Sequence, residues 1–265
     1  MRHFGILAHP IRHSLSPTMQ MAAFKALKIE ATFEAFDVEP SQLADFLKTH
    51  GEVEGLAVSM PHKENIGQFL DGVDETARAI GAVNTVYTKN GKRFGANTDG
   101  PGFLRAIRDV MPDLSGKRVL IVGAGGAARA IIHALKPLVG SITLINRTVP
   151  KGVQLAKEFG VRYGGKLEDL ITETPDIIVN ATPVGMPGHE DPEIIPQDFL
   201  KPGVVVFDIV YNPGHTTHLI EEAKKAGAIA MSGETMLLYQ GVLQFELWTG
   251  QKAPEKAMRA ALTTP

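Results

Sequence analysis

The sequence contains no cysteine among its 265 residues. This absence excludes disulfide bonds, a thiolate nucleophile and a zinc site built from cysteine, and it fits a reducing cytoplasm. An excess of charge is also missing, because 27 Lys and Arg residues are offset by 29 Asp and Glu residues. Without a basic face, we expect no nucleic-acid partner.

Long apolar runs are absent as well, so we expect no membrane span. The N-terminal stretch "MRHFGILAHPIRHS" has only a short apolar segment and no small-residue cleavage site. This argues against a signal peptide and favours a cytoplasmic location. What remains is 44% hydrophobic and 21% charged, as in ordinary soluble proteins, and is long enough for two domains.

Short apolar runs alternate with amphipathic stretches, which is typical of βα units around mostly parallel sheets. The first part of the chain is expected to contain strands at Phe4–Ala8, Thr32–Asp37 and Gly55–Val58, and helices at Pro17–Leu27, Ser41–Lys48 and near Asp74–Ile80. A hairpin is expected within 82–97, because Asn90-Gly91 suits a two-residue turn. After a link at Met111–Arg118, a second series opens with "KRVLIV" and continues with strands at Ile142–Ile145, Asp176–Asn180, Val204–Asp208 and Ala228–Met231 and a helix at Thr235–Trp248.

The segment "GAGGAA", Gly123 to Ala128, follows an apolar strand and opens a helix. It matches the Rossmann fingerprint, in which Gly123 permits the tight turn, Gly125 lets the backbone approach a pyrophosphate and Ala128 keeps the helix close to the strand. A tight βα turn without a ligand is the alternative. We predict that the dinucleotide binds at Gly123, Ala124, Gly125, Gly126 and Ala127.

The end of the next strand indicates which dinucleotide binds. An acidic residue there would bond the ribose 2′-hydroxyl of NAD, whereas an arginine accommodates the 2′-phosphate of NADP. The strand runs into Asn146, Arg147 and Thr148 with no acidic residue in the turn, and Lys151 follows. A guanidinium pairs with a phosphate bidentately. NADP is therefore the predicted cofactor, although Arg147 could also be an ordinary surface arginine.

Two serines precede the first expected helix. Ser16-Pro17 is a good helix start, with Ser16 as the N-cap and Pro17 as the first helical residue. Ser14 is not needed for that cap. Paired hydroxyls two residues apart suggest recognition of a polyol or a carboxylate.

Lys63 follows "VSMP" at the end of a run that reads as a buried strand. Lysines are ordinarily solvated, but Pro61 ends the strand and stiffens the turn, so Lys63 is expected to extend from a rigid sheet edge. Asn84 opens the hairpin, where it could bond turn backbone, and Asp99 could cap a helix that starts at Pro101. Their occurrence together favours a functional site.

These motifs resemble, from end to end of the chain, those of the shikimate dehydrogenase family. In order they are "HSLSP", "VSMPHK", "GAVNT", "NTDG", "GAGGAARA", "NRT", "NATPVGM", "DIVYNP" and "GETMLLYQG". The resemblance implies reversible, NADPH-dependent reduction of 3-dehydroshikimate to shikimate in the biosynthesis of chorismate and aromatic amino acids. It also implies an α/β protein with an N-terminal substrate domain on a mostly parallel sheet (1–100, completed by the C-terminal helix 237–265), a Rossmann NADP-binding domain (101–236) and a cleft between them.

The resemblance further assigns roles to single residues. Ser14 and Ser16 are expected to bind the substrate carboxylate, and Tyr211 to assist substrate binding. Ile209 and Gly233 are expected to border the nicotinamide. The ring hydroxyls and the reacting oxygen are expected to be bound by Ser59, Lys63, Asn84, Asp99 and Gln240.

Lys63 and Asp99 are the expected catalytic residues. Reduction of a ketone makes an oxyanion that needs a proton and a positive charge beside it, and an ammonium group supplies both. Asp99 is expected to hold the neighbouring hydroxyl and fix the ring, since positioning can contribute several kcal/mol to the barrier. Which of the two groups holds the shared proton is left open. This interpretation requires the two side chains to meet.

Several features leave alternatives open. The family usually has Asn-Val-Thr before the proline of the lysine motif and His at position 20, whereas this chain has Ala57, Ser59 and Gln20. These residues look more like quinate/shikimate dehydrogenases, which accept a ring with one more hydroxyl and use NAD, while "NRT" favours NADP. A catalytically dead NADP-sensing regulator is a further alternative, but it would tend to lose the lysine–aspartate pair.

Two other expectations concern metals and assembly. His215 and His218 have helical spacing but no obvious third ligand, so we interpret them as surface residues and expect no metal. The chain is expected to be a monomer or a homodimer.

Overall fold

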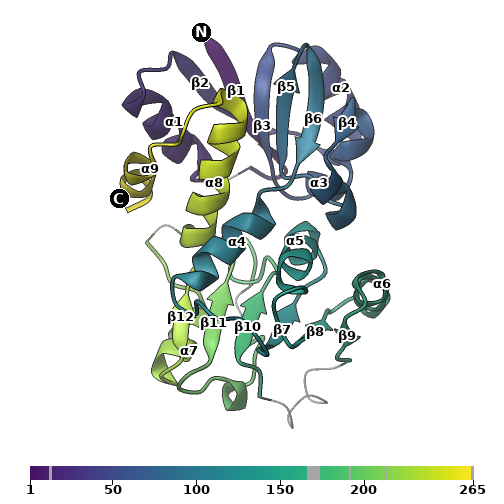
Figure 1. Ribbon diagram of the computed structural model, residues 1–265, viewed down its shortest axis with the longest axis vertical. Coiled ribbons are helices and arrows are strands. Elements are labelled where there is room, and N and C mark those ends of the chain that lie inside the picture. The colour runs from purple at the N-terminus through teal and green to yellow at the C-terminus, as the bar shows by residue number, and fades with distance from the viewer. Residues whose placement is uncertain (12–13, 166–173, 191, 213, 264–265) are drawn as a thin grey trace. The chain divides into compact units, whose positions relative to one another are not determined.

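The computed structural model describes residues 1–265 except 12–13, 166–173, 191, 213 and 264–265 (Figure 1). The chain forms two compact units. The first unit comprises Met1–Gly102 and Leu237–Pro265, and the second comprises Phe103–Met236. The chain leaves the first unit within α4 (Asp99–Arg108) and returns to it within α8 (Glu234–Thr249). The cleft expected between the domains stays a prediction.

The first unit is built on a six-stranded sheet with the order β2-β1-β3-β5-β6-β4. Its strands are β1 (Arg2–Ala8), β2 (Ala31–Asp37), β3 (Val53–Val58), β4 (Gly72–Val73), β5 (Thr85–Lys89) and β6 (Lys92–Ala96). Three neighbouring pairs are parallel and two are antiparallel, so the mostly parallel sheet is confirmed. The expected hairpin is β5–β6, and its turn has positive φ angles at Asn90 (53°) and Gly91 (73°).

Helix α8 packs on one face of this sheet through Trp248. The indole ring lies against Phe4 and Phe33, with ring centroids 5.6 and 5.9 Å apart, and its Nε1 donates to the carbonyl of Val86 at 2.9 Å. A Cβ at position 55 would overlap the same ring, which explains Gly55 in the buried strand β3. The helices α1 (Ser16–Ala26) and α9 (Glu255–Thr263) lie beside α8 (Figure 1).

The other face of the sheet is covered by α2 (Leu43–Thr49) and α3 (Glu75–Ile80). A hydrophobic cluster lies between these helices and the sheet. Alternate residues of β3, such as Leu56 and Val58, belong to it, because successive side chains of a strand point to opposite faces. Buried side chains of α2 and α3 complete it, among them Phe46 and Ala77. The sheet is therefore buried on both sides.

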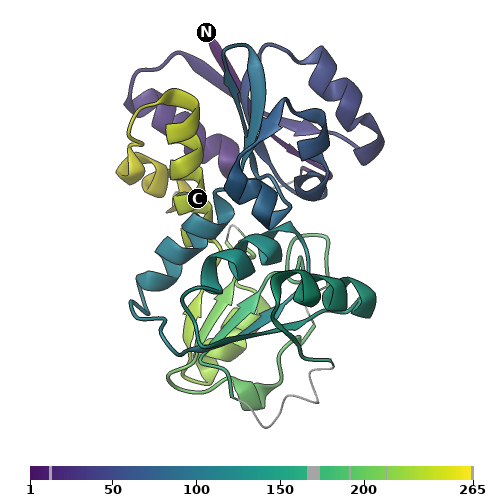
Figure 2. The ribbon, with the colours of Figure 1, turned by 45° about the vertical axis from the view of Figure 1, so that its right-hand side comes forward.

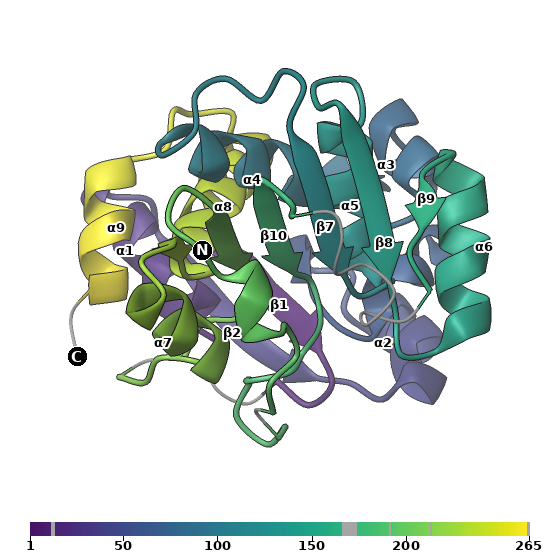
Figure 3. The ribbon, with the colours of Figure 1, turned by 90° about the horizontal axis from the view of Figure 1, so that it is seen from below.

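The second unit contains a six-stranded sheet whose described strand pairs are all parallel, in the order β12-β11-β10-β7-β8-β9. The strands are β7 (Arg118–Val122), β8 (Ser141–Ile145), β9 (Arg162–Tyr163), β10 (Ile177–Asn180), β11 (Val205–Asp208) and β12 (Ile229–Met231). This is the doubly wound order of a Rossmann domain, which confirms the fold class. Figure 3 shows β7, β8 and β10 side by side.

Helices follow the strands of the second unit as a doubly wound fold requires. They are α5 (Gly126–Leu135), α6 (Val149–Phe159) and α7 (His218–Lys225). Figure 2 shows α5 and α6 on the same side of the sheet. The strand order reverses between β7 and β10, and ligands bind parallel α/β sheets at such a switch point.

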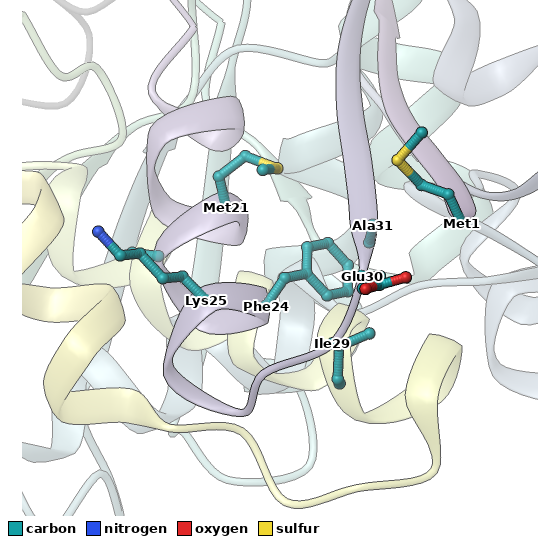
Figure 4. Close-up of a pocket in the computed structure, with 8 residues that line it drawn as sticks. Met1, Met21, Phe24, Lys25, Ile29, Glu30 and Ala31 are labelled. Carbon is teal, nitrogen blue, oxygen red and sulfur yellow. The ribbon is translucent and has the colours of Figure 1, made fainter.

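Some elements were not expected. The strands β4 and β9 have two residues each, too few to show an alternating pattern, and α9 follows the helix expected to be the last. A surface pocket beside β2, lined in part by Met21, Phe24 and Lys25 of α1 (Figure 4), contains no predicted site residue. No helix in the described part of the chain is long and apolar enough to cross a membrane.

Candidate active site

Lys63 and Asp99 form an ion pair in the first unit. Lys63 lies in a short 3-10 turn, His62–Glu64, which follows β3 after the link Ser59–Pro61. The Lys63 carbonyl accepts a hydrogen bond from the Val83 N–H at 2.7 Å. Its Nζ donates to Asp99 Oδ2 at 2.6 Å. The side chains are only 16% and 5% exposed. The structure thus brings the two expected catalytic groups together, and removing either would leave a largely buried charge unpaired.

Asn84 connects this pair to helix α8. Its Nδ2 donates to Asp99 Oδ1 at 2.8 Å and to Gln240 Oε1 at 3.3 Å. The Oδ1 of Asn84 accepts from the backbone N–H of Thr98 at 2.7 Å. Asn84 therefore also bonds backbone, which was the alternative to a functional role. Asp99 is itself the first residue of α4, so the alternative in which it caps a helix starting at Pro101 is wrong.

The three predicted serines lie in the same unit. Ser16 is buried but is the first residue of α1, and the N-cap position is Leu15, so the expectation that Ser16 caps the helix is wrong. The Oγ of Ser14 instead accepts from the Ser16 N–H at 3.2 Å, which ties down the helix start. Ser59 is half-buried directly after β3. Among the described residues, no hydrogen bond joins these serines to the Lys63–Asp99 pair.

Sequence reasoning missed three buried members of the network: Thr85, Thr98 and Gln244. The two threonines follow Asn84 and precede Asp99 directly in the motifs "GAVNT" and "NTDG". Gln244 lies four residues after Gln240, so both face the same side of α8. Two glutamines at this spacing in the middle of a mostly apolar helix are the signal that could have identified it.

His62 lies next to Lys63 and is almost fully buried. Its Nε2 lies 2.8 Å from the carbonyl of Val38 and, facing an acceptor, must carry the proton. Burial lowers the pKa of His62 below its ordinary value, and the hydrogen bond to Val38 opposes this effect. His62 is therefore neutral at neutral pH.

In the second unit, the turn after β7 has the geometry of a phosphate-binding loop. Gly123 has a φ of 111°, and a Cβ there would lie 2.9 Å from the backbone of Ala181. Gly125, by contrast, has an extended backbone, and no atom lies within 4 Å of where its Cβ would be. Open space at the N-terminus of α5 fits a pyrophosphate against the backbone N–H groups. Ala124 and Ala128 are buried, whereas Gly126 and Ala127 are half-buried.

Arg147 lies in the turn between β8 and α6 and is exposed. The amide of Asn146 donates to the carbonyl of Thr148 at 2.8 Å, which closes this turn, and Thr148 is the N-cap residue of α6. Lys151 is exposed in the first turn of the same helix. Two cationic side chains therefore lie in solvent close to the end of β8.

The residues expected to border the nicotinamide follow β11. Asp208 is buried, and its Oδ1 accepts from the Val210 N–H at 3.0 Å, which shapes the loop containing Ile209. Gly233 donates from its N–H to the Val210 carbonyl at 3.0 Å, and a Cβ there would overlap the carbonyl oxygen of Ile209. Ile209 and Gly233 are thus in contact. Tyr211, two residues after Ile209, is half-buried.

Three family models match the chain. They are described as "Shikimate dehydrogenase substrate binding domain" at residues 6–86, "Shikimate / quinate 5-dehydrogenase" at 105–210 and "Shikimate 5'-dehydrogenase C-terminal domain" at 233–263. The chain is also 43% identical to the shikimate dehydrogenase (NADP(+)) of Methanopyrus kandleri, over 97% of this chain and 93% of the relative.

Solved structures of shikimate dehydrogenases superimpose closely on this chain. The shikimate dehydrogenase of Aquifex aeolicus is 38% identical with a TM-score of 0.93, over 100% of this chain and 98% of that one. The shikimate 5-dehydrogenase of Thermus thermophilus, in complex with NADP(H) and shikimate, is 37% identical with a TM-score of 0.88, over 99% and 98% of the two chains. The chain therefore belongs to the shikimate dehydrogenase family.

Proposed function

We propose that this chain catalyses the reversible, NADPH-dependent reduction of 3-dehydroshikimate to shikimate. The observation that carries the proposal is the largely buried contact between Lys63 Nζ and Asp99 Oδ2, 36 residues apart in sequence, at 2.6 Å. Membership of the family supports the reaction, and relatives aligned over 97% of this chain carry the name shikimate dehydrogenase (NADP(+)). The presence of the ion pair also argues against a catalytically dead regulator.

In this proposal the first unit binds the substrate. Lys63 places a positive charge beside the reacting oxygen and delivers the proton that the forming alkoxide needs. Asp99 accepts a hydrogen bond from a ring hydroxyl and, with Asn84 and Gln240, holds the ring in place. The hydroxyls of Ser14, Ser16 and Ser59 complete substrate binding in this unit, and the phenol of Tyr211, a residue of the second unit, is proposed to assist it.

The second unit binds the cofactor, which supplies the hydride. Open space at Gly125, at the N-terminus of α5, fits its pyrophosphate, with the small residues Gly123, Ala124, Gly126 and Ala127 around it. Arg147 is proposed to pair with the 2′-phosphate, with Asn146, Thr148 and Lys151 beside it. Ile209 and Gly233 are proposed to border the nicotinamide.

The purified protein tests this function directly. We expect NADPH oxidation, followed by its near-ultraviolet absorbance, when 3-dehydroshikimate is added, and NADP reduction when shikimate is added. No turnover in either direction would refute the proposal.

Oxidation of quinate is the second candidate. Ser59 and Gln20 depart from the usual family pattern, and the model that matches residues 105–210 is described for both activities. Comparison of kcat/KM on shikimate and quinate with NADP and with NAD distinguishes them. We expect shikimate with NADP to be the preferred pair, because relatives along nearly the whole chain carry the name shikimate dehydrogenase (NADP(+)) and Arg147 favours the 2′-phosphate.

A further inference from the structure

We infer that Thr85 and Gln244 are positioning residues for the reaction, acting through the side-chain amide of Asn84. The inference rests on the proposed function, since it assigns these two residues to the same catalytic network. Both are buried, with 0% and 1% of their surface exposed, so neither is placed to contact bulk solvent. Each is instead bonded to Asn84, the residue that holds Asp99.

Thr85 supplies one of the hydrogen bonds to the oxygen of the Asn84 side-chain amide. Its Oγ1 donates to Asn84 Oδ1 at 2.8 Å. A hydroxyl has a single proton, and a second threonine oxygen, Thr98 Oγ1, lies 3.4 Å away as a competing partner. The Asn84 Oδ1 also accepts from the backbone N–H of Thr98 at 2.7 Å, so the direction of the Thr85 proton decides whether this oxygen has a second short hydrogen bond.

Gln244 restricts that direction, because the Thr85 proton cannot point at a group that donates to the same oxygen. Its Nε2 donates to Thr85 Oγ1 at 3.2 Å and to the backbone carbonyl of Asn84 at 3.0 Å. The Gln244 side-chain amide cannot be flipped, because its oxygen would then face the backbone carbonyl oxygen of Asn84, and a carbonyl can only accept. The donors therefore run in one sense from Gln244 through Thr85 to the Asn84 oxygen. Together with the Thr98 N–H they keep that oxygen facing donors, so the Asn84 nitrogen faces Asp99. Such chains strengthen each member by polarisation.

The oxygen of the Gln244 side chain gives an independent reason to assign this residue a positioning role. Its Oε1 is buried and has no hydrogen-bond partner among the described residues. An unpaired buried acceptor destabilises a fold, and an apolar side chain of the same length would avoid that cost. A glutamine in this place is therefore better explained by the orientation of Asn84 than by stability.

Matched substitutions separate positioning from packing. Thr85→Val keeps the shape and removes the hydroxyl, Thr85→Ser keeps the hydroxyl, and Gln244→Met keeps the length without the amide. We expect Thr85→Val and Gln244→Met each to lower kcat/KM for 3-dehydroshikimate about five- to tenfold, as the loss of one hydrogen bond to the Asn84 side-chain oxygen, direct or through Thr85, implies, with KM for NADPH unchanged. Thr85→Ser should retain most of the activity. The urea midpoint of Gln244→Met should equal or exceed that of the wild type.

Controls come from the same elements of the chain. Thr88→Val tests the same change at an exposed position of β5, and Gln251→Met does so after α8; both should behave as the wild type. Wild-type kcat/KM in Thr85→Val and Gln244→Met would overturn the inference. So would equal losses in Thr85→Ser and Thr85→Val, or a fall in urea midpoint that accompanies the loss of activity.

A measurement without turnover keeps the inference separate from the proposed function. The side-chain amide protons of Asn84, assigned by NMR from their absence in Asn84→Asp, should exchange slowly in the wild type and faster in Thr85→Val and Gln244→Met. Unchanged exchange in both variants would overturn the positioning role. An inactive wild type with the expected exchange pattern would refute the reaction alone.

Discussion

The two units build their predicted sites from different parts of the polypeptide. In the first unit, side chains carry the chemistry: Lys63, Asp99, Asn84 and Gln240 come from four separate segments and meet through hydrogen bonds. In the second unit, backbone carries it, because the turn at Gly123–Gly126 offers N–H groups and an open surface.

This difference determines how each site responds to change. A side-chain site fails when one functional group is removed, even where the fold survives. A backbone site does not depend on the functional group of any side chain. It fails when a Cβ fills the space next to the main chain, because the ligand must approach the backbone closely. The predictions below test this contrast, beginning with the largest effect.

Removal of the Lys63 ammonium should have the largest effect. Lys63→Met should lower kcat by about 10²- to 10⁴-fold, the usual contribution of a positioned acid–base group, with little change in KM for NADPH. Steady-state kinetics in both directions measure this. Lys63→Arg is the control that keeps the charge but moves the proton donor. Turnover near that of the wild type in Lys63→Met would exclude the residue from the chemistry.

The two glycines of the cofactor turn should respond in opposite ways to alanine. Gly125→Ala should keep its thermal stability and raise KM for NADPH about tenfold or more, because the new methyl fills only the open space proposed for the pyrophosphate. Gly123→Ala should lose about 1–3 kcal/mol of folding free energy, because of its φ of 111° and the overlap with Ala181. Urea unfolding and steady-state kinetics on both variants decide. Equal phenotypes would contradict the backbone site.

Cofactor choice should depend on Arg147. Arg147→Ala should raise KM for NADP about tenfold, as expected for loss of one charge-assisted contact, and should leave KM for NAD nearly unchanged. Lys151→Ala should act in the same direction and more weakly. An equal effect of Arg147→Ala on both cofactors would rule out recognition of the 2′-phosphate.

The smallest effect concerns stability and pH in the first unit. The lowered pKa of His62 means that the unfolded chain binds a proton below about pH 6.5 that the folded chain resists. The stability from this residue is thus complete above that pH and is lost as the pH falls. His62→Gln keeps a donor for the Val38 carbonyl and should lose less stability between about pH 8 and pH 5.5, as measured by urea unfolding. The same pH dependence in both proteins would contradict this assignment.

Much of the fold was predictable because its signals are local. Alternating apolar and amphipathic segments indicate βα units, and Asn90-Gly91 predicts the hairpin turn from two adjacent residues. Where local signals compete, the outcome differs: Ser16 has the chemistry of an N-cap but lies inside α1, and Ser14 bonds its N–H instead. The two-residue strands β4 and β9 depend on pairing with distant segments and leave no local pattern.

The linear sequence is enough to identify the family, the Rossmann turn and the cofactor preference, because each depends on contiguous residues whose geometry the backbone sets. Only the three-dimensional structure decides that Lys63 contacts Asp99, that Asn84 connects them to α8, and that Thr85 and Gln244 are hydrogen-bonded to Asn84. These contacts join residues up to 160 positions apart, as between Asn84 and Gln244. Hydrogen bonds at such separation are determined by packing, and packing is a property of the folded chain as a whole.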